Sequence, residues 1–432
     1  MRWGRWAGAL LATAILAADV TPAARHALPL PARVTVAADQ TQLIRLDLPG
    51  RLGVRALGPA GHLLVDGAPT GPTWRSLPGA ALELQPGQPG LYRLGLRLFG
   101  VLPWRSLQVQ AVPVPEVAPG GQSVGIVLQA LGPLVVRQVD VPGPDGPRTS
   151  PAAAAGMRVG DYVLAVDGAP VHTALAVQDA VQASRGAPVR LSLLRGGHPL
   201  AISVRPAWDA ATGTYLLGAW VRDEASGIGT LTFSSSERAV WGALGHPVTD
   251  PTTGHAVALR SGWLLRSVIA GLEPSRDGHP GEKEGVLVGG QAPLGAVTAN
   301  TAVGVFGRFT PGPPPRAGTL PIALQDQVHV GAARMLTVLH GAVVGSFAVR
   351  ITAVLPQRRA SSKGLVLTVT DPRLLRETGG IVQGMSGSPL LQDGRLIGAV
   401  THVLVDDPSR GYGVLAEWMA AQAGLLGPGR AV

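Results

Sequence analysis

The chain has 432 residues, of which 46% are hydrophobic and 15% charged, so it is long enough for two to four domains and too apolar to be wholly disordered. Its net charge of +9 comes almost entirely from scattered arginines, with no basic run longer than Arg358-Arg359, which argues against nucleic-acid binding. The absence of cysteine excludes disulfides, thiolate nucleophiles and cysteine-based zinc sites, and no other motif indicates a metal or an organic cofactor.

The N-terminus has the pattern of an export segment. Arg2 and Arg5 precede an apolar stretch from Trp6 to Ala18, which is a positive region followed by an apolar region of signal-peptide length. That stretch is shorter than the roughly 20 apolar residues that a spanning helix needs. We therefore expect residues 1–26 to be a signal peptide or a retained membrane anchor, and the protein to be exported across a membrane.

Residues 27–115 alternate apolar and polar side chains in short runs, separated by clusters of proline and glycine. Leu43–Leu48 and Leu91–Leu98 are two such runs. Alternation with a period of two is typical of strands, so this region predicts a small domain of the β-sandwich type. It carries no catalytic constellation. A Pro-rich stretch, Val112–Pro119, predicts a linker after it.

Residues 120–206 have the pattern of a PDZ domain. Ser150 is followed by Pro151, which predicts a short capped helix, and Gly156 predicts its end. A strand over Tyr162–Val166 and an Asp-Gly turn should follow, and then a second helix over Leu175–Arg185. This order of elements is similar to that of PDZ domains.

PDZ domains bind a peptide carboxylate with the backbone N–H groups of a glycine-containing loop, and the peptide then pairs as an added strand. The matching loop in this sequence consists of Ser123, Val124, Gly125 and Ile126, for which an ordinary strand start is the alternative interpretation. The expected partner is therefore a peptide or a protein C-terminus, although some such domains regulate their own chain.

The strongest chemical signal is the run Gly384-Met385-Ser386-Gly387-Ser388-Pro389, followed by a strand, an Asp-Gly turn and a second strand. It resembles the nucleophile segment of trypsin-like serine peptidases. The glycines at 384 and 387 permit positive φ, and the N–H groups of Gly384 and Ser386 can converge on a developing oxyanion. Ser386 is the expected nucleophile, because the pattern places it between the first Gly-x and the second Gly; Ser388 is the competing serine.

A serine nucleophile needs a general base, and the chain has ten histidines. His246 has small neighbours and lies about 140 residues before Ser386, which is the separation expected if one β-barrel supplies the base and a second supplies the nucleophile. His402 is the second candidate for the base. Because it follows the strand after the Asp-Gly turn, we assign it to binding or packing and expect it to line the substrate cleft together with Thr401. No supporting pattern surrounds the further histidines considered, which are His255, His279 and His340.

A carboxylate should orient the imidazole and fix its tautomer. Asp371 lies 15 residues before Ser386, and Asp250 lies four residues after His246. Asp406 and Asp407 are further candidates. Spacing does not choose among the four, and Asp371 can equally be a turn or helix cap before Pro372.

Taken together, the motifs resemble the SpoIVB peptidases, that is, stage IV sporulation protein B. The resemblance spans roughly Leu91 to Leu425 and is carried by these runs: Leu98–Pro103, Gly120–Gly125, Gly227–Phe233, Gly242–His246, Gly379–Pro389, Gly398–Val403 and Gly411–Val414. It implies a mainly β, multidomain chain that ends in a chymotrypsin-like double β-barrel peptidase domain over residues 207–432.

The resemblance also implies a function. It indicates an endopeptidase that the forespore exports into the space between its two membranes, that cleaves itself near the N-terminus, and that cleaves a membrane-bound regulator. That cleavage releases an intramembrane protease that processes pro-sigma-K. The family's nucleophile falls on Ser386, its histidine on His246 and its acidic residue on Asp371, which ranks Asp371 above Asp250.

Two other functions remain open from the sequence. One is a non-catalytic peptide-binding scaffold on a peptidase fold, and the other is a general envelope quality-control protease, in which a PDZ domain usually follows the peptidase domain. Gly380 stands six residues before Ser386, where trypsin-like folds place the floor of the primary pocket, so a strict preference for Lys or Arg through that position is not expected. Ala416–Leu425 predicts a closing helix with Trp418 and Met419 facing inward.

Overall fold

The computed structural model describes residues 32–38, 41–46, 51–59, 61–78, 81–143, 146–276, 278–310 and 318–426. The predicted signal peptide or anchor, residues 1–26, lies outside these ranges. The chain divides into two compact units, with the division between Pro115 and Glu116. No helix within the described ranges is long and apolar enough to cross a membrane.

The first unit consists of two sheets that share one apolar core, as the alternating pattern predicted. One sheet has the order β1 (Arg33–Ala37), β9 (Leu102–Val112), β8 (Gly90–Leu98), β3 (Arg51–Ala56) and β6 (Arg75–Pro78). The other has the order β2 (Gln42–Arg45), β7 (Ala81–Pro86), β4 (Leu63–Val65) and β5 (Ala68–Pro69). The buried leucines and valines come from alternate positions of both sheets, which is the arrangement of a β-sandwich.

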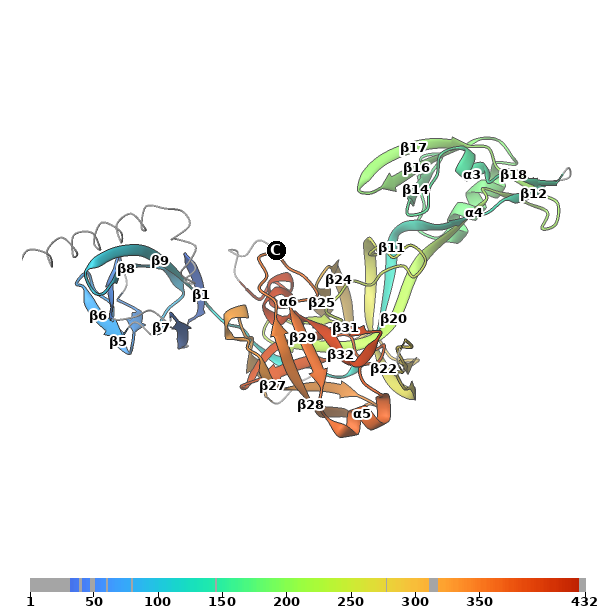
Figure 1. Ribbon diagram of the computed structural model, residues 1–432. Coiled ribbons are helices and arrows are strands. Elements are labelled where there is room, and N and C mark those ends of the chain that lie inside the picture. The colour runs from blue at the N-terminus through green and yellow to red at the C-terminus, as the bar shows by residue number, and fades with distance from the viewer. Residues whose placement is uncertain are drawn as a thin grey trace, which may run out of the picture. The chain divides into compact units, whose positions relative to one another are not determined.

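The second unit contains two six-stranded barrels (Figure 1). In the first barrel each strand pairs with the next and the last strand pairs back to the first. The order is β11 (Ser123–Gln138), β22 (Leu259–Glu273), β24 (Gly295–Thr301), β25 (Gly304–Phe309), β21 (Val240–Ala243) and β20 (Ala219–Ser235). Trp241 is fully buried in its core. Three short strands extend the sheet: β10 (Glu116–Pro119), β23 (Glu282–Leu287) and β26 (Leu320–Pro321).

The second barrel is closed in the order β27 (Gly331–Val338), β28 (Val344–Val354), β29 (Leu365–Val369), β32 (Asp407–Leu415), β31 (Arg395–Leu404) and β30 (Pro389–Gln392). A 3-10 turn, η1 (Gln325–Gln327), precedes it. The helix α5 (Pro372–Thr378) follows β29, and α6 (Ala416–Gln422) ends the barrel, with Trp418 and Met419 buried as predicted. The two rings confirm the predicted double β-barrel.

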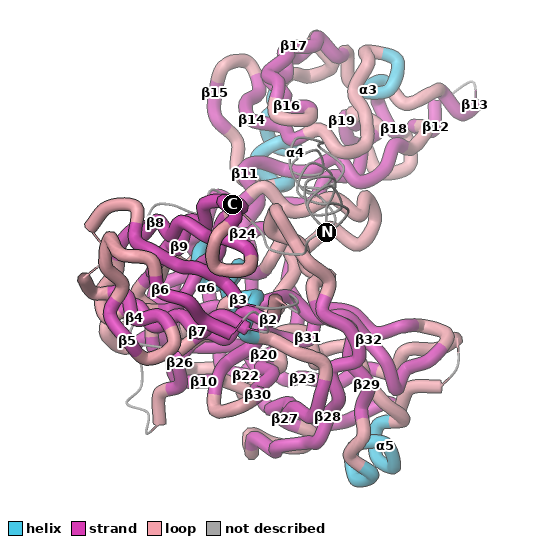
Figure 2. The backbone as a smooth tube through the Cα atoms, turned by 60° about the vertical axis from the view of Figure 1, so that its left-hand side comes forward, coloured by secondary structure: helices cyan, strands magenta, loops and turns pink. Residues whose placement is uncertain are grey.

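A further unit, residues 139–218, is inserted between β11 and β20 and is called the inserted unit below. Its elements are β12 (Val141–Gly143), β13 (Gly146–Arg148), α3 (Pro151–Ala154), β14 (Tyr162–Val166), β15 (Ala169–Pro170), α4 (Ala174–Ala183), β16 (Val189–Arg195), β17 (His198–Val204), β18 (Ala207–Asp209) and β19 (Thr214–Leu216). Ser150 caps α3 by accepting from the Ala153 N–H at 3.0 Å, as predicted. Figure 2 shows α3 and α4 as short helical segments among strands.

The inserted unit and the first barrel share two long strands, β11 and β20 (Figure 1). Residues 123–129 of β11 pair with β20 inside the barrel, and residues 134–138 pair with residues 219–222 of β20 beside the inserted unit. The predicted boundaries at 120–206 and 207–432 therefore differ from the structure, because the insertion begins and ends within these two strands. A sequence pattern does not show these boundaries, because β11 and β20 each continue without interruption from the barrel into the inserted unit.

Candidate active site

A cleft in the second unit brings together the predicted base and the predicted nucleophile. His246 comes from the first barrel, just after β21, and Ser386 comes from the second barrel, just before β30. Both line a cleft of about 470 Å³ together with Gly384, Thr401 and His402. Leu244 and Gly245, at φ 67° and 75°, turn the chain sharply before His246.

Residues 384–388, called the serine turn below, have the conformation that the sequence predicted. Gly384 and Gly387 lie at φ 87° and 91°, a region that favours glycine. A Cβ atom at Gly387 would lie only 2.1 Å from the Thr230 carbonyl oxygen. The Thr230 N–H donates to the Ser386 carbonyl at 2.9 Å, so the serine turn is fixed against β20 of the first barrel.

Three N–H groups of the serine turn donate hydrogen bonds to backbone carbonyls. Met385 donates to Val382, Gly387 to Val400 and Ser388 to Met385. The N–H groups of Gly384 and Ser386, in contrast, donate to no group among the described residues. An oxyanion site requires two such donors beside the nucleophile, held in place before the charge develops.

The Ser386 hydroxyl donates to the Thr401 carbonyl at 2.9 Å, a bond to β31 of the second barrel. In this arrangement the hydroxyl proton is not directed at an imidazole. Catalytic hydrogen bonds between a serine and its base commonly tighten only when substrate is bound.

His246 is oriented by the backbone. Its Nδ1 lies 2.8 Å from the Pro247 carbonyl oxygen. A carbonyl only accepts, so Nδ1 carries the proton and Nε2 keeps the lone pair that a general base needs. Burial lowers the pKa of His246 from its ordinary value, and the bond to Pro247 opposes this shift only in part.

His402 lies beside His246, with ring centroids 5.3 Å apart and planes tilted by 41°. Burial, together with the nearby His246 and Lys363, lowers the pKa of His402 to about 4. The ring is therefore neutral at neutral pH and does not repel a proton on His246. Thr401 and His402 both line the cleft.

The predicted role of Asp371 as the carboxylate that orients His246 does not hold in the structure. Asp371 caps α5 and accepts from the Arg373 backbone N–H at 3.0 Å and from the Ala348 N–H at 3.1 Å. The Arg373 guanidinium bonds both carboxylate oxygens, at 3.0 and 2.8 Å. That guanidinium, with the backbone donors, holds the pKa of Asp371 far below its usual range despite burial.

We expect Asp371→Asn to behave as a stability variant. It weakens a helix cap and an ion pair, so the free energy of unfolding should fall by about 1–2 kcal/mol. The folded pKa is depressed, so the contribution of this carboxylate is full above about pH 4 and is lost as the pH falls. Peptidase activity at pH 7 should fall less than about tenfold, measured beside thermal melts. A loss near 10⁴-fold, as for a missing triad carboxylate, would restore Asp371 to the catalytic group.

Two further candidate carboxylates, Asp250 and Asp407, also bond to groups other than His246. Asp250 is buried and accepts from Arg222 at 2.5 Å and from the N–H groups of Thr252 and Thr253. Burial raises the pKa of Asp250, but these donors outweigh burial and lower it overall. Asp407 accepts from Ser409. Among the described residues no carboxylate bonds to His246, so the Pro247 carbonyl takes the orienting role.

The sequence did not single out two groups near the serine turn. Glu282 lines the cleft, and its neighbour Lys283 is buried beneath Gly384. The pattern Glu282-Lys283-Glu284 in an exposed strand looks like a charged surface, and only the pairing of β23 with the residue before Gly384 shows otherwise.

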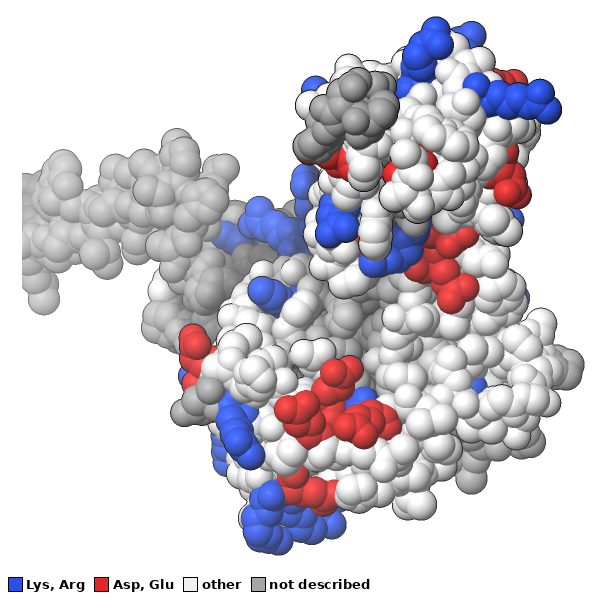
Figure 3. All heavy atoms as spheres, turned by 90° about the vertical axis from the view of Figure 1, so that its right-hand side faces the viewer, with Lys and Arg blue, Asp and Glu red and all other residues white. Residues whose placement is uncertain are grey.

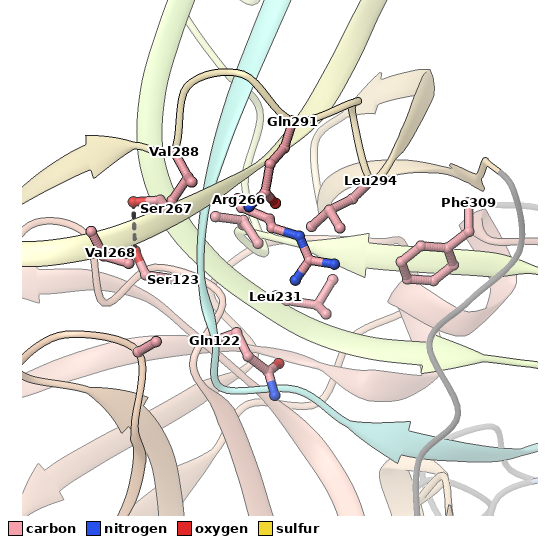
Figure 4. A pocket seen from close by; sticks show the side chains of 12 residues that line it. Gln122, Ser123, Leu231, Arg266, Ser267, Val268, Val288, Gln291, Leu294 and Phe309 are labelled. Atoms are coloured by element: carbon pink, nitrogen blue, oxygen red, sulfur yellow. Dashed lines mark hydrogen bonds between the residues drawn. The ribbon is translucent and has the colours of Figure 1, made fainter.

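A second pocket, of about 440 Å³, lies elsewhere on the first barrel (Figure 4). Arg266 extends across it toward Leu231 and Phe309, and Ser123 and Ser267 bond to each other at 3.2 Å at one side. Among the described residues that line it there is no histidine and no carboxylate. A serine there has no base, so the catalytic chemistry is assigned to the cleft of His246 and Ser386.

The predicted peptide-binding loop Ser123–Ile126 is a barrel strand in the structure. These four residues are buried and pair with β20 on one side, and three of them pair with β22 on the other. Neither edge is open to an added strand, so this prediction is wrong. The open edge beside the inserted unit is Ala219–Asp223 of β20, because no described strand pairs with its second side. This edge contacts α4, where the Ala174 N–H donates to the Asp223 carboxylate at 2.9 Å.

Charged groups on the face drawn in Figure 3 lie in several separate groups with uncharged surface between them. The blue Lys and Arg side chains there form no continuous stripe.

Comparison with known proteins agrees with the predicted peptidase and PDZ domains. Residues 213–420 match the SpoIVB peptidase S55 family, and residues 148–195 match the PDZ domain family. Among solved structures, the active form of the Rv3671c protease from M. tuberculosis is 16% identical over 48% of this chain and 77% of its own, with a TM-score of 0.28. The inactive form of the Rv3671c protease is 16% identical over 46% and 83%, with a TM-score of 0.27.

The two barrels, the cleft and the matched peptidase domain define a serine endopeptidase that carries a PDZ domain. More particularly, the peptidase part of the chain, residues 213–420, is similar to the SpoIVB peptidase S55 family.

Proposed function

We propose that this peptidase cuts peptide bonds with Ser386 as nucleophile and His246 as general base. The observation that supports the proposal is the cleft, whose lining includes His246, Gly384 and Ser386; the N–H groups of the last two donate to no group among the described residues. This is the set of groups that acyl transfer needs.

The reaction proceeds in two balanced steps. Ser386 Oγ forms a bond to the substrate carbonyl carbon while its proton passes to His246 Nε2, and the N–H groups of Gly384 and Ser386 hold the oxyanion. The carbon–nitrogen bond then breaks, and His246 returns the proton to the leaving amine. Water attacks the acyl-enzyme in the same way and frees Ser386.

The finer proposal concerns the biological substrate. We propose that the protein is exported into the space between the forespore membranes, cleaves itself near its N-terminus, and cleaves a membrane-bound regulator that controls processing of pro-sigma-K. The family match over residues 213–420 and the signal-like pattern of residues 1–26 support this role. Its partners are then that regulator and a peptide at the open edge of β20.

The chemical part is tested with a fluorophosphonate probe, which phosphonylates an activated serine whatever the peptide specificity. Intact-mass and peptide mass spectrometry should place one adduct on Ser386 of the wild type. Ser386→Ala should carry none, and its N-terminus should stay unprocessed. Ser388→Ala is the matched control and should keep the adduct on Ser386, at a reduced rate. An adduct on Ser388 alone would overturn the assignment.

The biological part is tested by complementation. A spore-forming host that lacks its own member of this family should regain cleavage of pro-sigma-K, followed by immunoblot, when it carries the wild-type chain. The Ser386→Ala chain should not restore this cleavage. A wild-type chain that labels with the probe but leaves pro-sigma-K uncleaved would keep the peptidase and exclude the sporulation role.

A further inference from the structure

Lys283 is a buried cation that the mechanism above does not use. It lies on β23 and is 2% exposed. It is one of only two lysines in a chain whose positive charge is otherwise arginine. Lysine is seldom fully buried without a carboxylate partner, and no carboxylate bonds to its Nζ among the described residues.

The side chain of Lys283 supports the serine turn from below. A Cβ atom built at Gly384 would lie 3.1 Å from Lys283 Cβ and 3.3 Å from its Cδ, so the lysine stem packs directly against the Gly384 backbone. The Lys283 N–H also donates to the Gln383 carbonyl at 3.0 Å. The peptide that carries the Gly384 N–H is thus held by Lys283 on two sides.

The charged end of Lys283 begins a row of hydroxyl groups beneath the same turn. Nζ donates to Thr337 Oγ1 at 2.7 Å, and Ser388 Oγ donates to Thr337 Oγ1 at 3.1 Å. Ser388 Oγ also lies 3.5 Å from Thr230 Oγ1, which donates to the Gly384 carbonyl at 2.9 Å. The row therefore connects Lys283 to the carbonyl of the residue whose N–H faces the oxyanion.

Burial alone lowers the pKa of Lys283 to about 7. The charged groups on the surrounding elements do not oppose this shift. Glu282 and Glu284 flank it on β23 but are exposed, and Glu273 on β22 is exposed opposite Glu282. On β27 the charged Arg334 is exposed and bonded to Ser346, and His246 lies in the cleft above the turn.

We propose that Lys283 is a positioning residue of the peptidase: its stem and its ammonium hold the serine turn, through Thr337, Ser388 and Thr230, in the conformation that aims the Gly384 N–H at the oxyanion. The proposal rests on the proposed role of Ser386. A buried charge without a carboxylate costs stability, and a cost of this kind is characteristic of groups kept for function.

The proposal fixes the sign of a pH effect. Below about pH 7 the ammonium is present, anchors the row of hydroxyls and adds positive charge beneath the oxyanion site. As the pH rises through about 7 the charge is lost. His246 must be neutral, which requires a pH above its own lowered pKa. As the pH increases from acid values, the phosphonylation rate of the wild type should therefore first increase, because His246 loses its proton. It should then decrease above about pH 7, because Lys283 loses its charge.

The test is the pH profile of fluorophosphonate labelling for the full chain and for Lys283→Met, which keeps the length of the stem and removes the charge. The labelling rate of the variant at pH 6 should be about 10–100-fold lower, the range expected when a catalytic group is misplaced. The decline above pH 7 should disappear, and kcat for casein hydrolysis should change more than KM. Thermal melts should show a melting temperature equal to or above that of the wild type, because a buried charge has been removed.

Thr337→Val is the second variant, because it breaks the row at its next member without changing charge. It should reproduce the slower labelling, and the double variant should be no slower than the worse single one. Because the chain has two lysines, NMR of ¹³Cε-labelled lysine can follow Lys283 directly. Its signal is the one that is missing from the spectrum of Lys283→Met, and it should titrate near pH 7.

An unchanged rate and pH profile in a folded Lys283→Met chain would overturn the proposal while leaving Ser386 as the nucleophile. Loss of the adduct from the wild type as well as from Ser386→Ala would instead remove the proposed function. A Lys283→Met chain that melts well below the wild type, with Thr337→Val fully active, would assign Lys283 a packing role only and would also overturn the proposal.

Discussion

Replacing His246 by alanine should lower kcat by at least about 10⁴-fold while the fold persists, because removing the base of a serine peptidase costs about as much as removing the nucleophile. The imidazole is partly exposed at the cleft, and among the described residues it hydrogen-bonds only to the Pro247 carbonyl, so few structural contacts are lost. The measurements are fluorophosphonate labelling and casein hydrolysis beside a thermal melt.

The matched control is His329→Ala, since His329 is an exposed histidine of the same chain that bonds Asp393 away from the cleft. It should keep full activity. The pH profile gives an independent check: burial lowers the pKa of His246, so activity should persist as the pH falls below 6.5 and decline only at more acid pH. Activity of His246→Ala within tenfold of the wild type would show that another group removes the serine proton.

The second large effect is expected for Gly387→Ala. The added methyl group would lie 2.1 Å from the Thr230 carbonyl oxygen and 2.5 Å from the Leu244 nitrogen, and the residue would have to keep φ near 91°. Overpacking and backbone strain together should cost about 2–5 kcal/mol. Labelling of Ser386 should be lost at all pH values, because the turn cannot keep its place against β20.

Gly394→Ala is the control for Gly387→Ala. Gly394 also lies at positive φ, 72°, but no atom lies within 4 Å of the Cβ it would gain. It should therefore show the conformational cost alone, about 1 kcal/mol, with labelling preserved. Equal loss of labelling in both variants would mean that positive φ, and not the close approach to β20, decides the effect.

The parts of the site that sequence predicted well are those fixed by neighbours along the chain. The serine turn depends on glycines two or three residues apart, and the hairpin after it on Asp393 and Gly394, which lie at φ 49° and 72°. The cap at Ser150 and the strand Tyr162–Val166 are local in the same sense. The alternating pattern of residues 27–115 also sufficed to predict a sandwich, because burial of one face defines a strand. The two barrels were predicted from the resemblance to SpoIVB peptidases.

The parts that sequence missed depend on pairing across long stretches of chain. Ser123–Ile126 has the composition of a binding loop, and only its pairing with β20 and β22 makes it a barrel strand. The family resemblance indicated Asp371 as the acidic member, yet Arg373, two residues later, pairs with its carboxylate. Lys283 looks like a surface charge until β23 is placed beneath the serine turn.

The insertion between β11 and β20 has a consequence for the newly made chain. Residues 123–129 find their barrel partners only about 100 and 140 residues later, in β20 and β22, and the ring closes only when β25 has been added. During synthesis the inserted unit is complete before the barrel that carries His246 can close, and Ser386 is added later still. The cleft that His246 and Ser386 line therefore cannot assemble until nearly all of the chain has been made.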